Sequence, residues 1–363
     1  MNGKIPALCI SLCASVASLG CGSSSMETPV QTDGYRQTNL VSDVAGTAAH
    51  TDPRLVNPRG IGFGPGQPFW IADRDFGTAR VFDPSGNPDI PLGIVIPPPP
   101  GSTSRPAPVA VVFNPIAQDF RLRDIPAQFL FATEDGTIST WATVGGNIPT
   151  SAVMAVDRSP DLAVYKGLAI LSPECCREFL AVANFRSGSI ETYNVGFSRL
   201  APPGSFADPD LPAGYAPFNI QLIGTQVFVS YAVRDVAQHD PVLGAGNGIV
   251  SIFDQEGNFV RRFVSNGPLN APWGMVRAGA NFGPFSNDIL IGNFGDGTVN
   301  AFDPVTGDFL GQLKDGSGKV IINPGLWALT FRTDGVGDPN SLYFTAGSPA
   351  ERHGLFGAIS FHG

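Results

Sequence analysis

Short apolar runs separated by glycine-containing turns recur along most of the chain. The clearest unit has apolar runs at 57–63 and 68–73, and a third run follows a glycine turn at 77–83. Within such runs apolar and polar positions alternate, as at 298–302. A period of two is typical of a β-strand that is buried more heavily on one face. Beyond the first twenty residues no stretch shows a convincing helical period. The pattern therefore predicts an all-β protein.

Two features of this unit recur in step. The third run, a glycine followed by alternating residues that end at or next to an aromatic side chain, returns at 136–141, 188–194, 248–254, 297–303 and, more loosely, 357–361. The first run begins in turn at Asn57, Ala107, Tyr165, Ala216, Ala271 and Asn323, with spacings of 50, 58, 51, 55 and 52 residues. Each unit has room for four strands of ordinary length, so we expect six four-stranded units.

Such units cannot bury both of their own faces, so they must stack on one another. A solenoid would satisfy the repeat equally well. The period and the four strands per unit favour a six-bladed β-propeller, in which radial closure protects the strand edges. The last unit stops after its third strand at Phe361, and residues 38–43 form a predicted strand ahead of the first unit. We predict that this N-terminal strand completes the last blade and closes the ring.

The N-terminal region differs from the rest. Residues 1–20 contain Lys4 and an apolar run at 5–19 that is too short to span a bilayer comfortably, which indicates a signal peptide. The run ends at Cys21 in a sequence that resembles a bacterial lipobox, although Ser18 stands where leucine is usual. We expect an exported, membrane-anchored lipoprotein with a flexible tether at 21–38 and the propeller at 39–363. A plainly secreted protein is the alternative.

The charge of the chain argues against two classes of partner. The net charge is −9 and no basic cluster is present, which argues against nucleic acid and against docking on anionic lipid headgroups. We expect a monomer that meets the membrane only through its N-terminal lipid.

Cys175 and Cys176 are the two cysteines of the predicted propeller. The sequence leaves open whether they form a vicinal disulfide or stay as thiols in a turn.

Several segments resemble known propeller proteins. The units at 57–87 and 271–303 resemble NHL-type propeller repeats. More specifically, residues 39–43, 49–53, 55–58, 244–248 and 270–274 are similar to a family of uncharacterised bacterial exported proteins, over essentially the whole mature chain. Arg59 departs from that family, which usually has tryptophan there, so we expect different packing at the inner end of the first blade. The resemblance implies the fold and no particular activity.

Loops at one end of the predicted blades carry most of the polar candidates for a site. Propeller topology places on one face His50, Asp52, Asn57, Asp73, Arg74, Asp75, Glu134, Asp135, Asn184, Arg186, Asn293 and Asp296. Asp73, Asn184 and Asn293 follow second strands at equivalent positions and could hold Ca²⁺ or another divalent cation in the channel. Repetition at equivalent positions favours the alternative, in which these side chains cap turns through local hydrogen bonds.

The fourth unit contains a long insertion at 232–246. It carries Arg234, Asp235, His239 and Asp240 after Tyr231, whereas the matching loop elsewhere has only a few residues. Long loops on rigid scaffolds often carry function. This loop therefore either covers the channel mouth or is a tolerated surface insertion.

No familiar catalytic motif is present. The chain has four histidines, no metalloprotease helix motif and no nucleophile elbow. The leading hypothesis is a binding or scaffold module for a protein, a glycan or a small-molecule ligand. The rival is a divalent-metal-dependent hydrolase or lactonase with a cation in the central channel, and the third possibility is a structural spacer.

Overall fold

The computed structural model describes residues 1–3, 33–174, 177–202, 204–347 and 351–363. The chain divides into two compact units, Met1–Gln31 and Thr32–Gly363, and the second contains all the sheets. Cys21, Cys175 and Cys176 lie outside the described residues, as do most of the predicted signal peptide and tether. None of the helices among the described residues has the length and hydropathy of a membrane-spanning segment.

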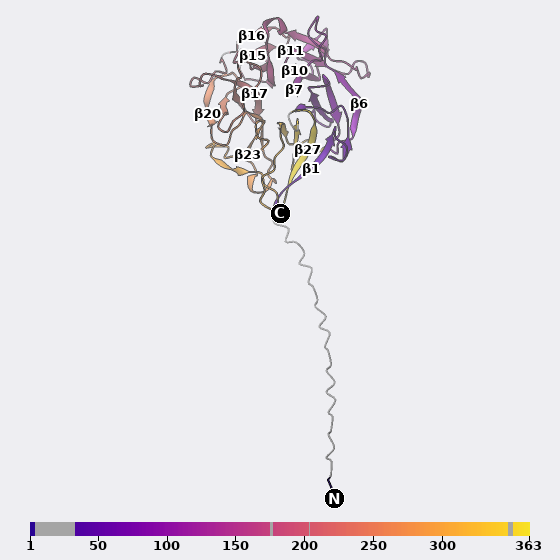
Figure 1. Cartoon of the computed structure of the whole chain (residues 1–363). Helices are drawn as coiled ribbons and strands as arrows, with labels where there is room; N and C mark the ends of the chain where they lie inside the picture. The colour runs from indigo at the N-terminus through magenta and orange to yellow at the C-terminus, as the bar shows by residue number, and fades with distance from the viewer. Residues whose placement is uncertain (4–32, 175–176, 203, 348–350) are drawn as a thin grey trace. The chain divides into compact units, whose positions relative to one another are not determined.

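The second unit is a six-bladed β-propeller, as the repeat predicted (Figure 1). The first five blades are four-stranded antiparallel sheets whose strands follow one another in chain order. Blade one is β3 (Pro58–Gly62), β4 (Phe69–Asp73), β5 (Thr78–Phe82) and β6 (Pro88–Val95). Blade two is β7 (Pro108–Phe113), β10 (Phe129–Thr133), β11 (Thr137–Trp141) and β12 (Val153–Asp157). Blade three is β13 (Tyr165–Leu171), β14 (Phe179–Asn184), β15 (Ser189–Asn194) and β16 (Arg199–Leu200).

The remaining blades continue this order. Blade four is β17 (Tyr215–Ile223), β18 (Gln226–Val233), β19 (Ile249–Phe253) and β20 (Phe259–Ser265). Blade five is β21 (Pro272–Arg277), β22 (Ile289–Asn293), β23 (Val299–Phe302) and β24 (Phe309–Gln312). Blade six contains β25 (Leu326–Thr330), β26 (Ser341–Ala346) and β27 (Leu355–His362). Outside the blades lie a small hairpin and two short 3-10 helices: β8 (Arg121–Leu122), β9 (Ile125–Pro126), η1 (Ser159–Asp161) and η2 (Gly283–Phe285).

The N-terminal strand closes the ring. Strand β1 (Gly34–Ser42) pairs antiparallel with β27, and β2 (His50–Thr51) adds to the outer edge of β1. Figure 1 shows β1 and β27 side by side. Ring closure by an N-terminal strand is thus confirmed, and the strand begins at Gly34, earlier than the predicted residue 38. Tyr35 fixes this early part, because its ring is buried and its hydroxyl donates to the Phe282 carbonyl at 2.9 Å.

The inner strands of neighbouring blades contact one another around the whole ring, from β3 through β7, β13, β17, β21 and β25 back to β3. Glycines permit this close approach. A Cβ on Gly60 would lie 2.8 Å from Ala110 Cα, and a Cβ on Gly274 would lie 2.5 Å from the Trp327 carbonyl oxygen. Such distances are too short for any side chain. The result is a narrow central channel walled by β3, β7, β13, β17, β21 and β25.

Candidate ligand-binding pocket at the channel mouth

A polar pocket of about 460 Å³ opens at the end of the channel where the inner strands begin. We call it the polar pocket, and it is lined by Arg74, Asp75, Arg105, Ala107, Glu134, Asp135 and His239. Arg74 and Asp75 follow β4, Glu134 and Asp135 follow β10, and Ala107 precedes β7. These are the loops of the face on which the sequence placed its candidates. His239 reaches the pocket from the blade-four insertion.

Glu134 lies at the bottom of the polar pocket and is contacted by three cationic side chains. Its carboxylate makes close ion pairs with the Arg59 guanidinium and the Lys166 ammonium group, and Arg74 Nε lies 3.2 Å from Oε2. The side chains of Arg59, Lys166 and Glu134 are almost completely buried. Arg59 comes from β3 and Lys166 from β13, so this arrangement, the Glu134 cluster, joins three blades.

The electrostatics of the Glu134 cluster favour a permanently charged carboxylate. Burial alone would raise the pKa of Glu134, but the nearby charges of Arg59, Lys166 and Arg74 hold it well below its usual range. Glu134 is therefore ionised at neutral pH and has no proton to donate. The neighbouring Asp135 differs, because burial raises its pKa while one carboxylate oxygen accepts the Ala107 amide at 2.7 Å.

The blade-four insertion is tied to the channel mouth. Asp235 Oδ1 accepts the backbone amides of His239 and Asp240 at 2.8 and 3.2 Å, which closes a turn at the tip of the loop. Asp240 Oδ1 in turn lies 3.2 Å from Lys166 Nζ and 3.0 Å from His239 Nδ1. These contacts, His239 first, lower the pKa of Asp240 to about 2 although burial opposes them. Lys166 thus connects the loop directly to Glu134.

The rest of the insertion contacts blade three and the loop before β21, where Asn270 Oδ1 accepts the Gly244 amide at 2.8 Å. Arg234 donates to the Arg186 carbonyl at 2.8 Å, and Arg186 donates to the Ala237 carbonyl at 3.3 Å. Tyr231 is buried among apolar side chains of blades three and four and does not line the polar pocket. Of the candidates in this region, His239 and Asp240 are therefore the two that the fold brings to the Glu134 cluster.

Asp73, Asn184 and Asn293 lie apart in blades one, three and five, and one side-chain oxygen of each accepts a backbone amide. Asp73 Oδ1 accepts the Phe76 amide at 3.4 Å, and Asn184 Oδ1 accepts the Ser187 amide at 3.2 Å. Asn293 Oδ1 accepts the Asn270 amide at 3.0 Å. Among the described residues no group of three or more histidine, cysteine, aspartate or glutamate side chains could hold a metal ion. The contacts of Asp73 and Asn184 span three residues and are local turn bonds, whereas Asn293 accepts an amide 23 residues away in the loop before β21.

His50 and Asp52 lie elsewhere, beside the outer part of blade one. Asp52 makes a close ion pair with the buried Arg80, and both residues line a different cavity of about 210 Å³ together with His50.

The sequence alone did not identify Lys166 or Arg105 as site residues, and it marked Arg59 only as a departure from a resembled family. The available signal was a lysine inside the otherwise apolar run at 163–171, since a buried lysine requires an acidic partner.

Comparison with known proteins gives relatives at the level of sequence and of fold. No family model matches the chain. The chain is 32% identical over 326 residues to the uncharacterized protein R648 of Acanthamoeba polyphaga mimivirus, covering 88% of this chain and 78% of the relative. It is 29% identical over 343 residues to the uncharacterized protein L690 of the same virus, covering 88% and 84%. The resemblance to a bacterial exported family stays a prediction.

Solved structures share the fold at low sequence identity. The soluble aldose sugar dehydrogenase of Escherichia coli, in its apo form, superposes with a TM-score of 0.55 at 13% identity, covering 90% of this chain and 99% of that one. A streptogramin B lyase superposes with a TM-score of 0.50 at 14% identity, covering 91% and 98%. At such identities the likeness shows the fold and does not extend to the chemistry.

Proposed function

The chain belongs to the same family as the mimivirus protein R648, and from the polar pocket we propose that it is a binding module for a small, neutral, hydrogen-bonding ligand such as a sugar. The observation that carries this proposal is the Glu134 cluster. Its ion pairs fix the floor of the pocket from three blades, so the polar groups are positioned before a ligand arrives. The volume of about 460 Å³ is that of an ordinary small-molecule site.

The balance of charge around the pocket favours a neutral ligand. The pocket wall carries Arg74 and Arg105 together with Asp75 and Asp135, and the buried cations Arg59 and Lys166 are matched by Glu134 and Asp240. A ligand with a large net charge of either sign would therefore gain little. Hydroxyl groups can both donate to the carboxylates and accept from the guanidinium groups, and hydrogen bonds with a charged partner are stronger than neutral ones.

Arg105 offers the least disruptive test, because it is exposed and contacts the Asp75 carbonyl at 3.2 Å and the Phe76 ring. Arg105→Ala should weaken sugar binding at least about tenfold, since a hydrogen bond from a charged donor contributes roughly 1.5–3 kcal/mol. Saturation-transfer NMR with neutral hexoses and N-acetylhexosamines would identify a bound sugar, and calorimetry would give the affinities.

The matched control is Arg277→Ala, at the far end of an inner strand, where an exposed guanidinium donates to the Asn287 carbonyl at 3.0 Å. Binding should be unchanged in this variant. The proposal fails if the unmodified protein binds none of these sugars, or if both variants lose the same affinity. No observation on the described residues favours the metal-dependent hydrolase over this binding role.

We also propose that the module is displayed on a membrane through a lipid on Cys21, which rests on the leader pattern alone. In bacterial cells supplied with labelled palmitate, the unmodified chain should take up label and sediment with membranes. Cys21→Ser should abolish both properties, because serine lacks the thiol that accepts the lipid. A Cys9→Ser variant in the apolar leader is the control and should label normally. Label that persists in Cys21→Ser would contradict the anchor.

A further inference from the structure

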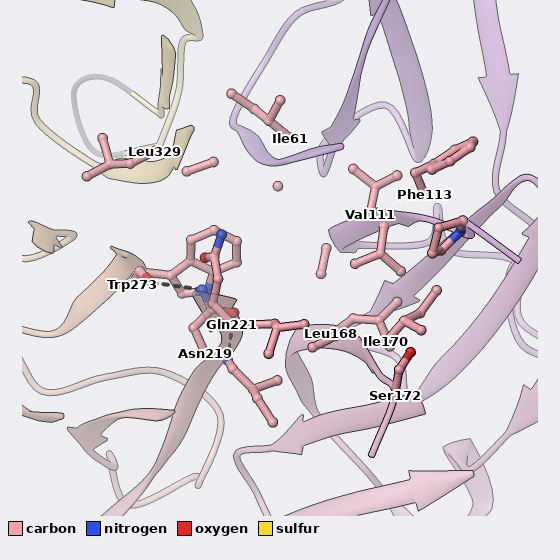
Figure 2. Close-up of a pocket in the computed structure, with 18 residues that line it drawn as sticks. Ile61, Val111, Phe113, Leu168, Ile170, Ser172, Asn219, Gln221, Trp273 and Leu329 are labelled. Carbon is pink, nitrogen blue, oxygen red and sulfur yellow. Dashed lines mark hydrogen bonds between the residues drawn. The ribbon is translucent and has the colours of Figure 1, made fainter. Parts of the chain in front are cut away.

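A second cavity lies in the channel, on the other side of the Glu134 cluster from the polar pocket. We call it the channel cavity. It measures about 300 Å³, and strands of all six blades contribute to its wall. Figure 2 shows its labelled side chains arranged around a common space: Ile61, Val111, Phe113, Leu168, Ile170, Ser172, Asn219, Gln221, Trp273 and Leu329. Most of them are apolar, and none of the residues that line this cavity carries a charge.

The two cavities are separated along the inner strands. On β3 the cluster residue Arg59 immediately precedes Gly60, where the wall of the channel cavity begins. On β13 Lys166 lies two residues before Leu168, the first residue of that strand in the wall. The partition is completed by Trp273, whose Nε1 donates to the Lys166 carbonyl at 2.8 Å while its ring lines the channel cavity. The channel cavity therefore opens at the face where the inner strands end.

Most polar groups in the wall already have partners. Asn219 donates to the Trp273 carbonyl at 2.8 Å, and its Oδ1 accepts the Ile220 amide at 2.8 Å. The side chains of Gln221 and Ser172 make no hydrogen bond to another described residue, and both lie near the open end, where β17 and β13 finish. The interior side chains are thus mainly apolar, and side chains with free hydrogen-bonding groups lie at the mouth.

We propose that the channel cavity binds a small, uncharged, mainly apolar molecule about the size of two fused aromatic rings, with one polar group at the open end. A dry apolar cavity of about 150 Å³ is large enough to bind benzene, so this cavity has room for a larger ring system. A charged molecule would lose its hydration without finding a counter-ion in the wall. The polar group of the ligand would meet Gln221 and Ser172. This site is separate from the polar pocket and does not depend on it.

The probe for this site is 2-naphthol, which is uncharged at neutral pH and carries a single hydroxyl. Calorimetry on the full chain should give saturable binding with one molecule per chain. In protein with ¹⁵N-labelled tryptophan, the indole signal of Trp273 should shift, whereas that of Trp70, which stacks on Phe129 between blades one and two, should stay in place. No saturable binding, or a shift confined to other tryptophans, would overturn the proposal.

Variants at the mouth test the location independently. Ile170→Trp fills the opening from a partly exposed position and should weaken 2-naphthol binding at least tenfold. Leu222→Trp, from the neighbouring strand, should do the same and replaces it if Ile170→Trp melts too early to be measured. Gln221→Leu should weaken binding about threefold to tenfold, the effect of one neutral hydrogen bond.

Two controls complete the design. Val305→Trp adds the same indole at a position that is 77% exposed and outside the cavity, and Arg105→Ala alters only the polar pocket. Both should bind 2-naphthol like the unmodified protein. If Ile170→Trp and Leu222→Trp bind as tightly as the unmodified protein, or if Val305→Trp is equally weakened, the channel cavity is not the site. Because Arg105 lines only the polar pocket, Arg105→Ala should weaken sugar binding and leave 2-naphthol binding unchanged, so the two proposals can fail independently.

Discussion

Deleting strand β1 should lower the melting temperature by roughly 10–20 °C, because several ladder hydrogen bonds of about 1 kcal/mol each are lost together. The register of β1 on β27 runs from Gly34 opposite His362 to Ser42 opposite Leu355, so the deletion removes a whole strand of blade six. It would leave β27 as an open edge and uncover apolar surface in the ring. Calorimetry of the full chain and of a chain lacking residues 34–42 measures the loss.

Two neighbouring residues on β1 separate ring closure from a general effect of altering the strand. Tyr35 is 4% exposed and packs against Phe282, Phe285 and Phe361, whereas Arg36 points to solvent. Tyr35→Ala should cost about 3–5 kcal/mol of unfolding free energy, and Arg36→Ala should change it by no more than about 0.5 kcal/mol. An unchanged melt after deletion of β1 would refute closure of the ring by this strand.

Glu134→Gln should destabilise the protein by about 3–5 kcal/mol, although the two side chains have nearly the same shape. The substitution leaves the charges of Arg59 and Lys166 buried without their common counter-ion. Asp240 and Glu351 remain as partners at 3.2 and 3.3 Å, but both are substantially exposed and compensate less. Urea unfolding followed by far-ultraviolet circular dichroism gives the free energy.

The control for this substitution is Glu174→Gln, which removes a carboxylate charge at an exposed position. Its unfolding free energy should stay within about 0.5 kcal/mol of that of the unmodified protein. A second variant, Glu134→Gln with Lys166→Met, removes one buried cation as well and should recover part of the loss. If the double variant is less stable than Glu134→Gln alone, the loss does not arise from uncompensated buried charge.

The stability contributed by the ion pairs of Glu134 should depend on pH. The pKa of Glu134 in the folded protein lies well below its ordinary value of 4.5, so its contribution to stability is complete above about pH 4.5. That contribution is lost as the pH falls through the folded-state pKa. The difference in unfolding free energy between the unmodified protein and Glu134→Gln should therefore narrow below pH 4.5 and remain constant between pH 6 and 8.

The fold could be predicted from the sequence because each blade repeats one local pattern. The start of the first strand returns at Asn57, Ala107, Tyr165, Ala216, Ala271 and Asn323. The same reasoning did not predict where β1 begins. Residues 34–37 lack the apolar alternation of the other strands, and they are ordered by pairing with the last strand of the chain. Because the partner strand lies at the other end of the sequence, residues 34–37 themselves carry no pattern from which a strand could be predicted.

The candidate site was less predictable than the fold. Loop topology places Arg74, Glu134 and Asp135 on one face, and these residues do line one pocket. The inner-strand cations Arg59 and Lys166 could not be assigned to Glu134, because their partner lies 75 and 32 residues away on another blade. Asp52 was predicted to belong to the site, but it pairs with the buried Arg80 and lines a different cavity. Distances across blades depend on packing that no sequence spacing encodes.

Blade six is assembled from the two ends of the chain, and this has a consequence for the order of folding. During synthesis β1 is among the first strands of the propeller to emerge, yet its partner β27 exists only after residue 355 has been added. Until then the apolar side chains of Tyr35, Leu40 and Val41 have no finished surface to cover. Pairing so distant in sequence is slow to form. The nascent propeller therefore stays an open ring until β27 has been synthesised.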